Sequence, residues 1–176
     1  GLIDSASEIE ALATSVADNG GVYFVPAFSG LGAPWWLPTA KATFTGMTLG
    51  TGKAHICRAV LESIGYQIAD LIGAMTSSAG IRLRELKVDG GPTKNGFLME
   101  FQSDLLGVPV VRSEIEDASA FGAFLMNGFA SGRLESFGQA SALAHFEPEI
   151  VPAGLPSVRE AYEGWKEVIR DMINKK

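Results

Sequence analysis

The spacing of apolar residues between Lys53 and Ser78 predicts one long amphipathic helix. Apolar side chains recur there every three to four positions, which is the repeat of a single helix face. These positions are Ile56, Val60, Ile64, Ile68, Leu71 and Met75. Gly80 follows where a left-handed C-cap residue is expected, so the helix should end just before it.

Shorter apolar runs, rich in β-branched and aromatic residues, predict strands. They cover residues 21–28, 83–91 and 108–113, and glycine or proline borders each of them. Between the first run and the long helix, residues 29–52 contain too many glycines and prolines for one regular element. This segment should be a long functional loop with a short strand at Ala42 to Thr45.

Further helices alternate with these strands and suggest the fold class. Residues 95–106 have a helical pattern stopped by Gly107, and residues 117–131 have another closed by Gly132. Strand and helix units in series predict an α/β fold with a sheet covered by helices. Ligands of such folds bind beyond the carboxyl ends of the strands, where the Asp89-Gly90-Gly91 sequence falls.

The sequence also predicts a helix at each end of the chain. The first should be amphipathic and begin at a capping box formed by Ser5 and Glu8. A short helix should follow Arg133, and a proline-marked loop should lead from it to the last helix. That last helix carries apolar residues along one side: Val158, Tyr162, Trp165, Ile169 and Ile173.

Composition and charge narrow the class of protein. The chain of 176 residues suits one domain, and its net charge of -6 argues against nucleic acid as a partner. Cys57 is the only cysteine, which excludes an intrachain disulfide and favours a cytoplasmic setting. No apolar run reaches the roughly 20 residues that cross a bilayer, so no membrane association is expected. Because no initiator methionine precedes the first helix, we expect a fragment of a longer protein.

Two glycine-containing segments are candidates for phosphate or nucleotide binding. The Asp89-Gly90-Gly91 sequence is either a tight turn in which Asp89 bonds local amides or a corner that holds a nucleotide. The sequence "GTGK" that ends at Lys53 is not a P-loop, because the first glycine of that motif is missing and Ala54 replaces its hydroxyl residue.

Other candidate residues have structural and functional interpretations. His55 and His145 lie far apart with no carboxylate at ligand spacing, which favours surface or core roles over a metal site. Trp35 and Trp36 could stack on a sugar or base, although paired tryptophans more often close over a core or an interface. Glu62 should face away from the apolar stripe as a solvated or salt-bridged group, with a catalytic role as the alternative.

Four segments together resemble the C-terminal half of the FGGY carbohydrate kinases: "VYFVPAFSGLGAPWW", "TFTGMTLGTGKAHICRAVLESIGYQIADL", "IRLRELKVDGGPTKNGFLMEFQSDLLGVPV" and "DASAFGAFLMNGFASG". The second of these segments, together with the preceding Ala42, meets the family's second signature at ten positions. They are Ala42, Phe44, Gly46, Met47, His55, Ile56, Ala59, Val60, Leu61 and Glu62. The resemblance implies an actin-like, ribonuclease-H-like ATPase fold of two domains. Residues 1–176 would be the C-terminal, nucleotide-binding domain without its first strands, with a mixed sheet flanked by helices.

The resemblance also implies which residues contact ATP. Gly50, Gly90 and Gly91 should pack their backbone against the nucleotide, and Asn95 should hydrogen-bond it from the first turn of a helix. A β-carbon at Gly90 or Gly91 would occupy the volume needed by the purine or ribose. Asp89 would then shape the turn.

The implied reaction is transfer of the ATP γ-phosphate to a polyol. The loop "PAFSGLGAPWW" is more similar to that of family members acting on glycerol than to that of members acting on xylulose, so glycerol is the favoured substrate. The alternatives are a kinase for another sugar such as a pentulose, or a non-catalytic binding module, and a homo-oligomer remains open. Mg²⁺ would bind through the nucleotide, and the catalytic aspartate and most substrate contacts belong to the family's first domain. The chain alone is therefore expected to be inactive, with no catalytic residue or metal ligand of its own.

Overall fold

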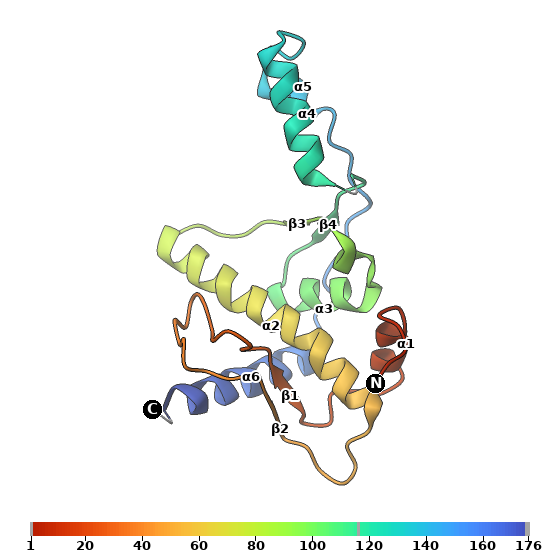
Figure 1. The fold of residues 1–176 in the computed structure, drawn as a ribbon, viewed down its shortest axis with the longest axis vertical. Coiled ribbons are helices and arrows are strands. Elements are labelled where there is room, and N and C mark those ends of the chain that lie inside the picture. The colour runs from red at the N-terminus through yellow and green to blue at the C-terminus, as the bar shows by residue number, and fades with distance from the viewer. Residues whose placement is uncertain (1, 116, 175–176) are drawn as a thin grey trace.

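The computed structural model describes residues 2–115 and 117–174 (Figure 1). The elements in chain order are α1 (Glu8–Thr14), β1 (Tyr23–Val25), β2 (Thr43–Thr45), α2 (Lys53–Ala79), β3 (Leu86–Val88), the 3₁₀ helix η1 (Gly91–Lys94), α3 (Gly96–Leu106), β4 (Val110–Arg112), α4 (Ala118–Ala130), α5 (Phe137–Ser141) and α6 (Pro156–Asn174). Helix α2 crosses the body of the molecule and contacts α1, α3 and β1.

The strands form two separate pairs in the described residues. β1 pairs with β2 in antiparallel fashion, and β3 pairs with β4 in parallel. Both kinds of pairing expected of a mixed sheet are therefore present, but not in one continuous sheet. The strands are also shorter than the apolar runs predicted. β1 ends at Val25 because Pro26 has no amide hydrogen, and Ala27 N already turns back to donate to Val25 O at 2.9 Å.

Most helix ends lie where the sequence predicts them. Gly80 and Gly107 are left-handed C-caps of α2 and α3, with φ of 64° and 65°. Asp117 caps α4 by accepting a hydrogen bond from Ala120 N. The predicted capping box at Ser5 is wrong, because the Ser5 hydroxyl bonds Ser7 Oγ at 2.7 Å and α1 begins at Glu8.

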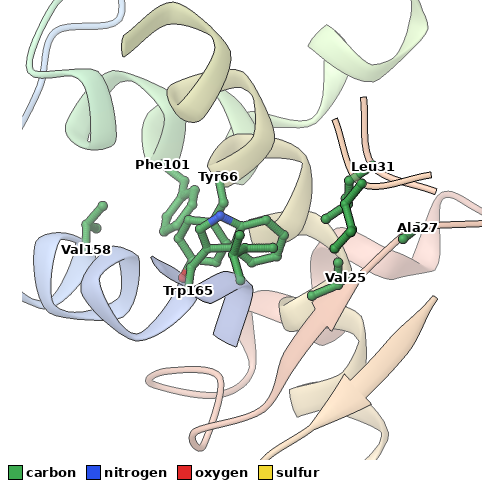
Figure 2. Packing of buried hydrophobic residues seen from close by; sticks show 9 residues of the cluster. Val25, Ala27, Leu31, Tyr66, Phe101, Val158 and Trp165 are labelled. Atoms are coloured by element: carbon green, nitrogen blue, oxygen red, sulfur yellow. The ribbon is translucent and has the colours of Figure 1, made fainter. Parts of the chain in front are cut away.

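An aromatic cluster forms the centre of the main core (Figure 2). The Tyr66 ring on α2 lies between Trp165 of α6 and Phe101 of α3, with centroid separations of 5.2 and 5.5 Å. Val25 of β1 and Leu31 of the following loop complete it. The predicted apolar side of the last helix is confirmed, because α6 uses it to cover this cluster.

The apolar stripe predicted for α2 is not its most buried face. Leu71 and Met75 are 40% and 61% exposed, whereas Glu62, Tyr66 and Asp70 are buried. Because the aromatic cluster lies on the Tyr66 side, the helix turns two carboxylates toward the protein interior. Apolar spacing alone could not reveal this orientation, since other parts of the chain pack against more than one side of α2.

All three tyrosines have raised pKa values. Burial is the main cause at each of them. The negative charge of Glu62 adds to the rise in the pKa of Tyr66, and the hydrogen bond from Tyr162 to Asp70 adds to the rise at Tyr162. In the native protein each phenol therefore stays protonated to a higher pH than in the unfolded chain.

We expect this difference to appear as alkaline instability. A raised native pKa contributes stability that is complete below the unfolded pKa of about 10 and is lost as the pH rises above it. The free energy of unfolding should therefore fall above about pH 10. Tyrosinate absorbance should appear only as far-UV circular dichroism reports unfolding. Ionisation near the ordinary pKa in the folded protein would contradict this expectation.

Helix α4 extends with α5 away from the rest of the molecule (Figure 1). None of its 13 residues is buried among the described residues, none is charged, and Phe124 and Met126 are 60% and 58% exposed. A helix that is apolar on all sides is typical of a buried helix. No helix in the described part of the chain is both long and apolar enough to cross a membrane.

The exposed side of α4 should make the 176-residue chain associate at high concentration. Replacing Phe124 and Met126 with serine should weaken this association about tenfold, because less apolar surface is then buried on contact. Sedimentation velocity over a concentration series would measure the change. The matched control is Met75→Ser, which removes an equally exposed side chain from α2 and should have little effect. Equal effects of both replacements would contradict a specific role for α4.

Candidate functional site

The predicted corner lies at the carboxyl ends of the parallel pair β3 and β4. Val88 and Arg112, the last residues of these strands, are register partners. The chain then turns through Gly90, whose φ of 92° favours glycine, into η1. Thr93 closes the turn, because its N and Oγ1 both donate to Gly90 O, at 3.1 and 2.7 Å. Asp89 is exposed, so its predicted role in shaping the turn remains a prediction.

The surface above the paired glycines is open. A β-carbon built on Gly90 or on Gly91 would meet no atom of the described residues within 4 Å. The backbone of Gly91 does not adopt a positive φ, so neither conformation nor internal packing requires glycine at this position. The corner therefore offers space that a ligand could fill.

Two hollows flank Gly91. One, of about 490 Å³, is lined by Gly91 and Pro92 of η1, by Asn95, which precedes α3, and also by residues of α1 and α2. The other, of about 320 Å³, contains Gly90, Gly91, Thr93 and Arg112. Both volumes are within the range of small-molecule sites. A larger hollow of about 610 Å³ lies between the end of α3 and the start of α6, away from these strand ends.

The first amide groups of α3 are already engaged. Asn95 is the N-cap residue, and its Oδ1 accepts a hydrogen bond from Leu98 N at 2.8 Å. Glu10 of α1 accepts another from Phe97 N at 2.9 Å. A carboxylate thus occupies the place where a helix start would hold an anion. The start of α3 is therefore not free to bind an anion, whereas the Nδ2 group of Asn95 remains able to donate a hydrogen bond to a ligand.

Gly50 lies apart from these residues. Gly50 precedes α2, which begins at Lys53. The hollow beside Gly91 is lined by Leu61 and Ile64, which lie further along the same helix. Because α2 rises about 12 Å between Lys53 and Leu61, Gly50 is distant from this hollow. A β-carbon at Gly50 would make only an ordinary contact, 3.7 Å from Thr48 Oγ1. The structure therefore brings Gly90, Gly91 and Asn95 together, and a contact between Gly50 and the same ligand stays a prediction.

The two carboxylates on the buried face of α2 have structural partners. Glu62 is buried and salt-bridged, which is one of the two structural states predicted for it: Arg58 Nε lies 2.8 Å from Oε1. Asn19 Nδ2 and Tyr66 Oη each donate to Oε2 at 2.9 Å. With these three donors around it, Glu62 is not placed to act as a general base.

Asp70 is the second buried carboxylate, and the sequence pattern missed it. It accepts hydrogen bonds from Trp165 Nε1 at 2.8 Å, Tyr162 Oη at 2.7 Å and Trp35 Nε1 at 3.1 Å. These bonds join α2, α6 and the loop after β1. Trp35 thus belongs to the core, as predicted, whereas Trp36 is 74% exposed and the core interpretation is wrong for it.

The histidines lie in separate places. His55 Nδ1 accepts a hydrogen bond from Gly52 N at 3.1 Å and so caps the start of α2. His145 is in the loop after α5, where its carbonyl accepts from Glu114 N at 3.0 Å. Across residues 2–115 and 117–174, no group of three or more histidine, cysteine or acidic side chains is arranged to hold a metal ion.

The sequence of the chain matches a known family over most of its length. Residues 2–131 match the FGGY family of carbohydrate kinases, C-terminal domain. Over 167 residues the chain is 50% identical to a glycerol kinase of Symbiobacterium thermophilum, an alignment that covers 94% of this chain and 34% of that protein. The chain thus spans about a third of the length of the curated relatives it matches.

Solved structures agree with this match. The crystal structure of Plasmodium falciparum glycerol kinase with ADP superposes with a TM-score of 0.86 at 32% identity, over 97% of this chain and 34% of that one. A xylulose kinase from Brucella ovis gives a TM-score of 0.84 at 24% identity, over 97% and 35% of the two chains. The second likeness shows the fold alone. The expected α/β fold class, that of the C-terminal domain of these kinases, is confirmed.

Proposed function

The chain belongs to the FGGY family of carbohydrate kinases, and from this we propose that residues 1–176 are the nucleotide-binding domain of an ATP-dependent glycerol kinase. The complete enzyme would transfer the γ-phosphate of ATP to a hydroxyl of glycerol and form glycerol 3-phosphate. The rest of the protein would contain the N-terminal domain and the first strands of this one. We place the enzyme in the cytoplasm, which is consistent with its single, buried cysteine.

Glycerol is the proposed substrate because this chain is more similar in sequence to glycerol kinases than to xylulose kinases. Glycerol kinases are 32% to 50% identical to this chain, with 50% and 48% for two bacterial relatives. Xylulose kinases of comparable fold reach only 20% to 26% identity. A pentulose kinase is therefore the weaker alternative.

The corner at Gly90 and Gly91 is our proposed site for the nucleoside of ATP. Its open surface, the hollow of about 490 Å³ and the Nδ2 donor of Asn95 support this placement. The start of α3 is already hydrogen-bonded to Glu10, which supports an orientation of ATP in which the phosphates lie away from this helix start. Gly50, before α2, would contact the nucleotide through its backbone at a second point.

The chemical step would depend on the part of the protein outside this chain. Mg²⁺, bound through phosphate oxygens, supplies charge neutralisation when a phosphoryl group is transferred. We place the general-base aspartate and most glycerol contacts in the N-terminal domain, consistent with the engagement of Glu62 and Asp70 in the core. The role of this chain would be to bind the nucleotide and hold it in line with the alcohol.

Steady-state assays of the full-length protein test the proposal. ADP release from ATP should depend on the added alcohol, and kcat/KM should be higher for glycerol than for xylulose. The chain expressed alone should release no ADP in response to either. A preference for xylulose would favour the pentulose kinase, and a full-length protein inactive with both would favour the non-catalytic binding module.

A further inference from the structure

Arg112 lies at the end of β4, beside the corner formed by Gly90 and Gly91. It is the last residue of β4 and the register partner of Val88, after which the neighbouring strand turns into the corner. Ser113 N donates to Val88 O at 2.9 Å and keeps the two strand ends together. The Arg112 side chain therefore starts beside the point where the corner begins, and it lines the smaller hollow with Gly90 and Gly91.

The guanidinium group of Arg112 is bonded to the turn itself. Its Nη1 donates to Thr93 O at 3.2 Å. Thr93 in turn donates twice to Gly90 O, from its amide and from its hydroxyl. A continuous chain of hydrogen bonds thus leads from Arg112 to the carbonyl next to Gly91. A charged donor strengthens the first of these bonds relative to a neutral one.

Glu147 forms an ion pair with the other terminal nitrogen of the Arg112 guanidinium. Its Oε2 lies 2.7 Å from Arg112 Nη2, and its own amide donates to Arg112 O at 2.9 Å. The segment around Glu147 runs beside β4, with an isolated bridge between Ser113 and Phe146. The backbone hydrogen bond and the side-chain ion pair both fix the position of Glu147. The two terminal nitrogens of the Arg112 guanidinium therefore have fixed orientations.

We propose that Arg112, oriented by Glu147, is a positioning residue for the nucleotide. It holds the turn from Gly90 to Asn95 in the shape that receives the nucleoside of ATP. This inference rests on the proposed function. Arginine suits the task because its planar fork can bond Thr93 and Glu147 at once, whereas one ammonium group has no such fixed geometry.

Kinetics of full-length variants test the inference. Arg112→Ala should raise the KM for ATP about tenfold while kcat and the KM for glycerol stay within about twofold. Arg112→Lys should recover only part of the loss, and Glu147→Gln should raise the KM for ATP about threefold. The control Lys166→Ala removes a charge from α6, where it pairs with Glu163 and not with the turn, and should leave the KM for ATP unchanged.

The Thr93 variants provide an independent measurement if Arg112→Ala does not fold. Thr93→Val keeps the shape and removes the hydroxyl donor, so it should raise the KM for ATP about threefold, whereas Thr93→Ser should restore it. A lowered melting temperature with an unchanged KM for ATP in the Arg112 and Thr93 variants would overturn the inference.

A variant of Gly91 separates this inference from the proposed function. If Gly91→Leu raises the KM for ATP and the Arg112 and Thr93 variants do not, the proposed nucleotide site stands and the positioning role is wrong. If none of them changes the KM for ATP, the placement of the nucleotide fails, and the positioning role fails with it.

Discussion

Replacing Gly91 with leucine in the full-length enzyme should raise the KM for ATP on the order of 100-fold. The new side chain would enter the open space above the corner, where we place the purine or ribose, and the nucleotide could bind only by displacing it. Gly91→Ala should have a smaller effect, about fivefold, since it adds a single methyl group. Initial rates over a range of ATP concentrations would give both values.

The choice of Gly91 over Gly90 removes one source of ambiguity. Gly90 has a φ of 92°, so any replacement there would strain the backbone and change the corner itself. Gly91 has no positive φ and nothing near its added β-carbon, so the folded state should tolerate leucine. The matched control is Gly73→Leu, also in open space but on α2, which should leave ATP kinetics unchanged. Normal ATP kinetics in Gly91→Leu would place the nucleotide elsewhere.

Replacing Glu62 with leucine should lower the free energy of unfolding by about 3 kcal/mol or more. The change leaves Arg58 without its counter-ion and leaves the donors of Asn19 and Tyr66 unpaired in the interior. Arg58 Nη1 keeps its hydrogen bonds to Val16 O at 2.8 Å and Ala13 O at 3.4 Å, which limits the loss. Urea denaturation followed by circular dichroism would measure it.

Two further variants distinguish a structural role of Glu62 from a catalytic one. Glu160→Ala removes an exposed acid from α6 and should change the free energy of unfolding by less than about 0.5 kcal/mol. Glu62→Gln keeps an acceptor for Tyr66 and Asn19 and should retain kcat within a few fold in the full-length enzyme. A fall in kcat of about a thousandfold in a folded Glu62→Gln enzyme would assign Glu62 to the chemistry and contradict its structural role.

Local chemistry explains which parts of the site were predictable. The paired glycines at the end of an apolar run, followed by Asn95 and a helical pattern, indicated the corner and the cap of α3. Each of those features is set by residues within a few positions of one another. Gly50 was grouped with them by resemblance, and no described contact joins it to the corner.

Arg112 and Glu147 lacked such a local signal. Arg112 meets Thr93 from 19 positions away, and Glu147 reaches Arg112 only because its segment lies beside β4. A charged residue at a strand end is most often a solvated group, so its role depends on the neighbouring strand and turn. Glu10 is a similar case, since it caps α3 from 87 positions earlier.

The sequence by itself determined the helices α2, α3, α4 and α6, most of their ends and the location of the corner. Periodicity, caps and left-handed glycines act within one or two helical turns, and their energies therefore depend on neighbouring residues alone. Tertiary structure decided the strand lengths and the burial of Glu62 and Asp70. The partners of these carboxylates include Asn19 and Trp165, which lie 43 and 95 positions away from them. Such distant groups are brought together only by packing of the whole chain, because a buried charge is tolerated where folding supplies its donors.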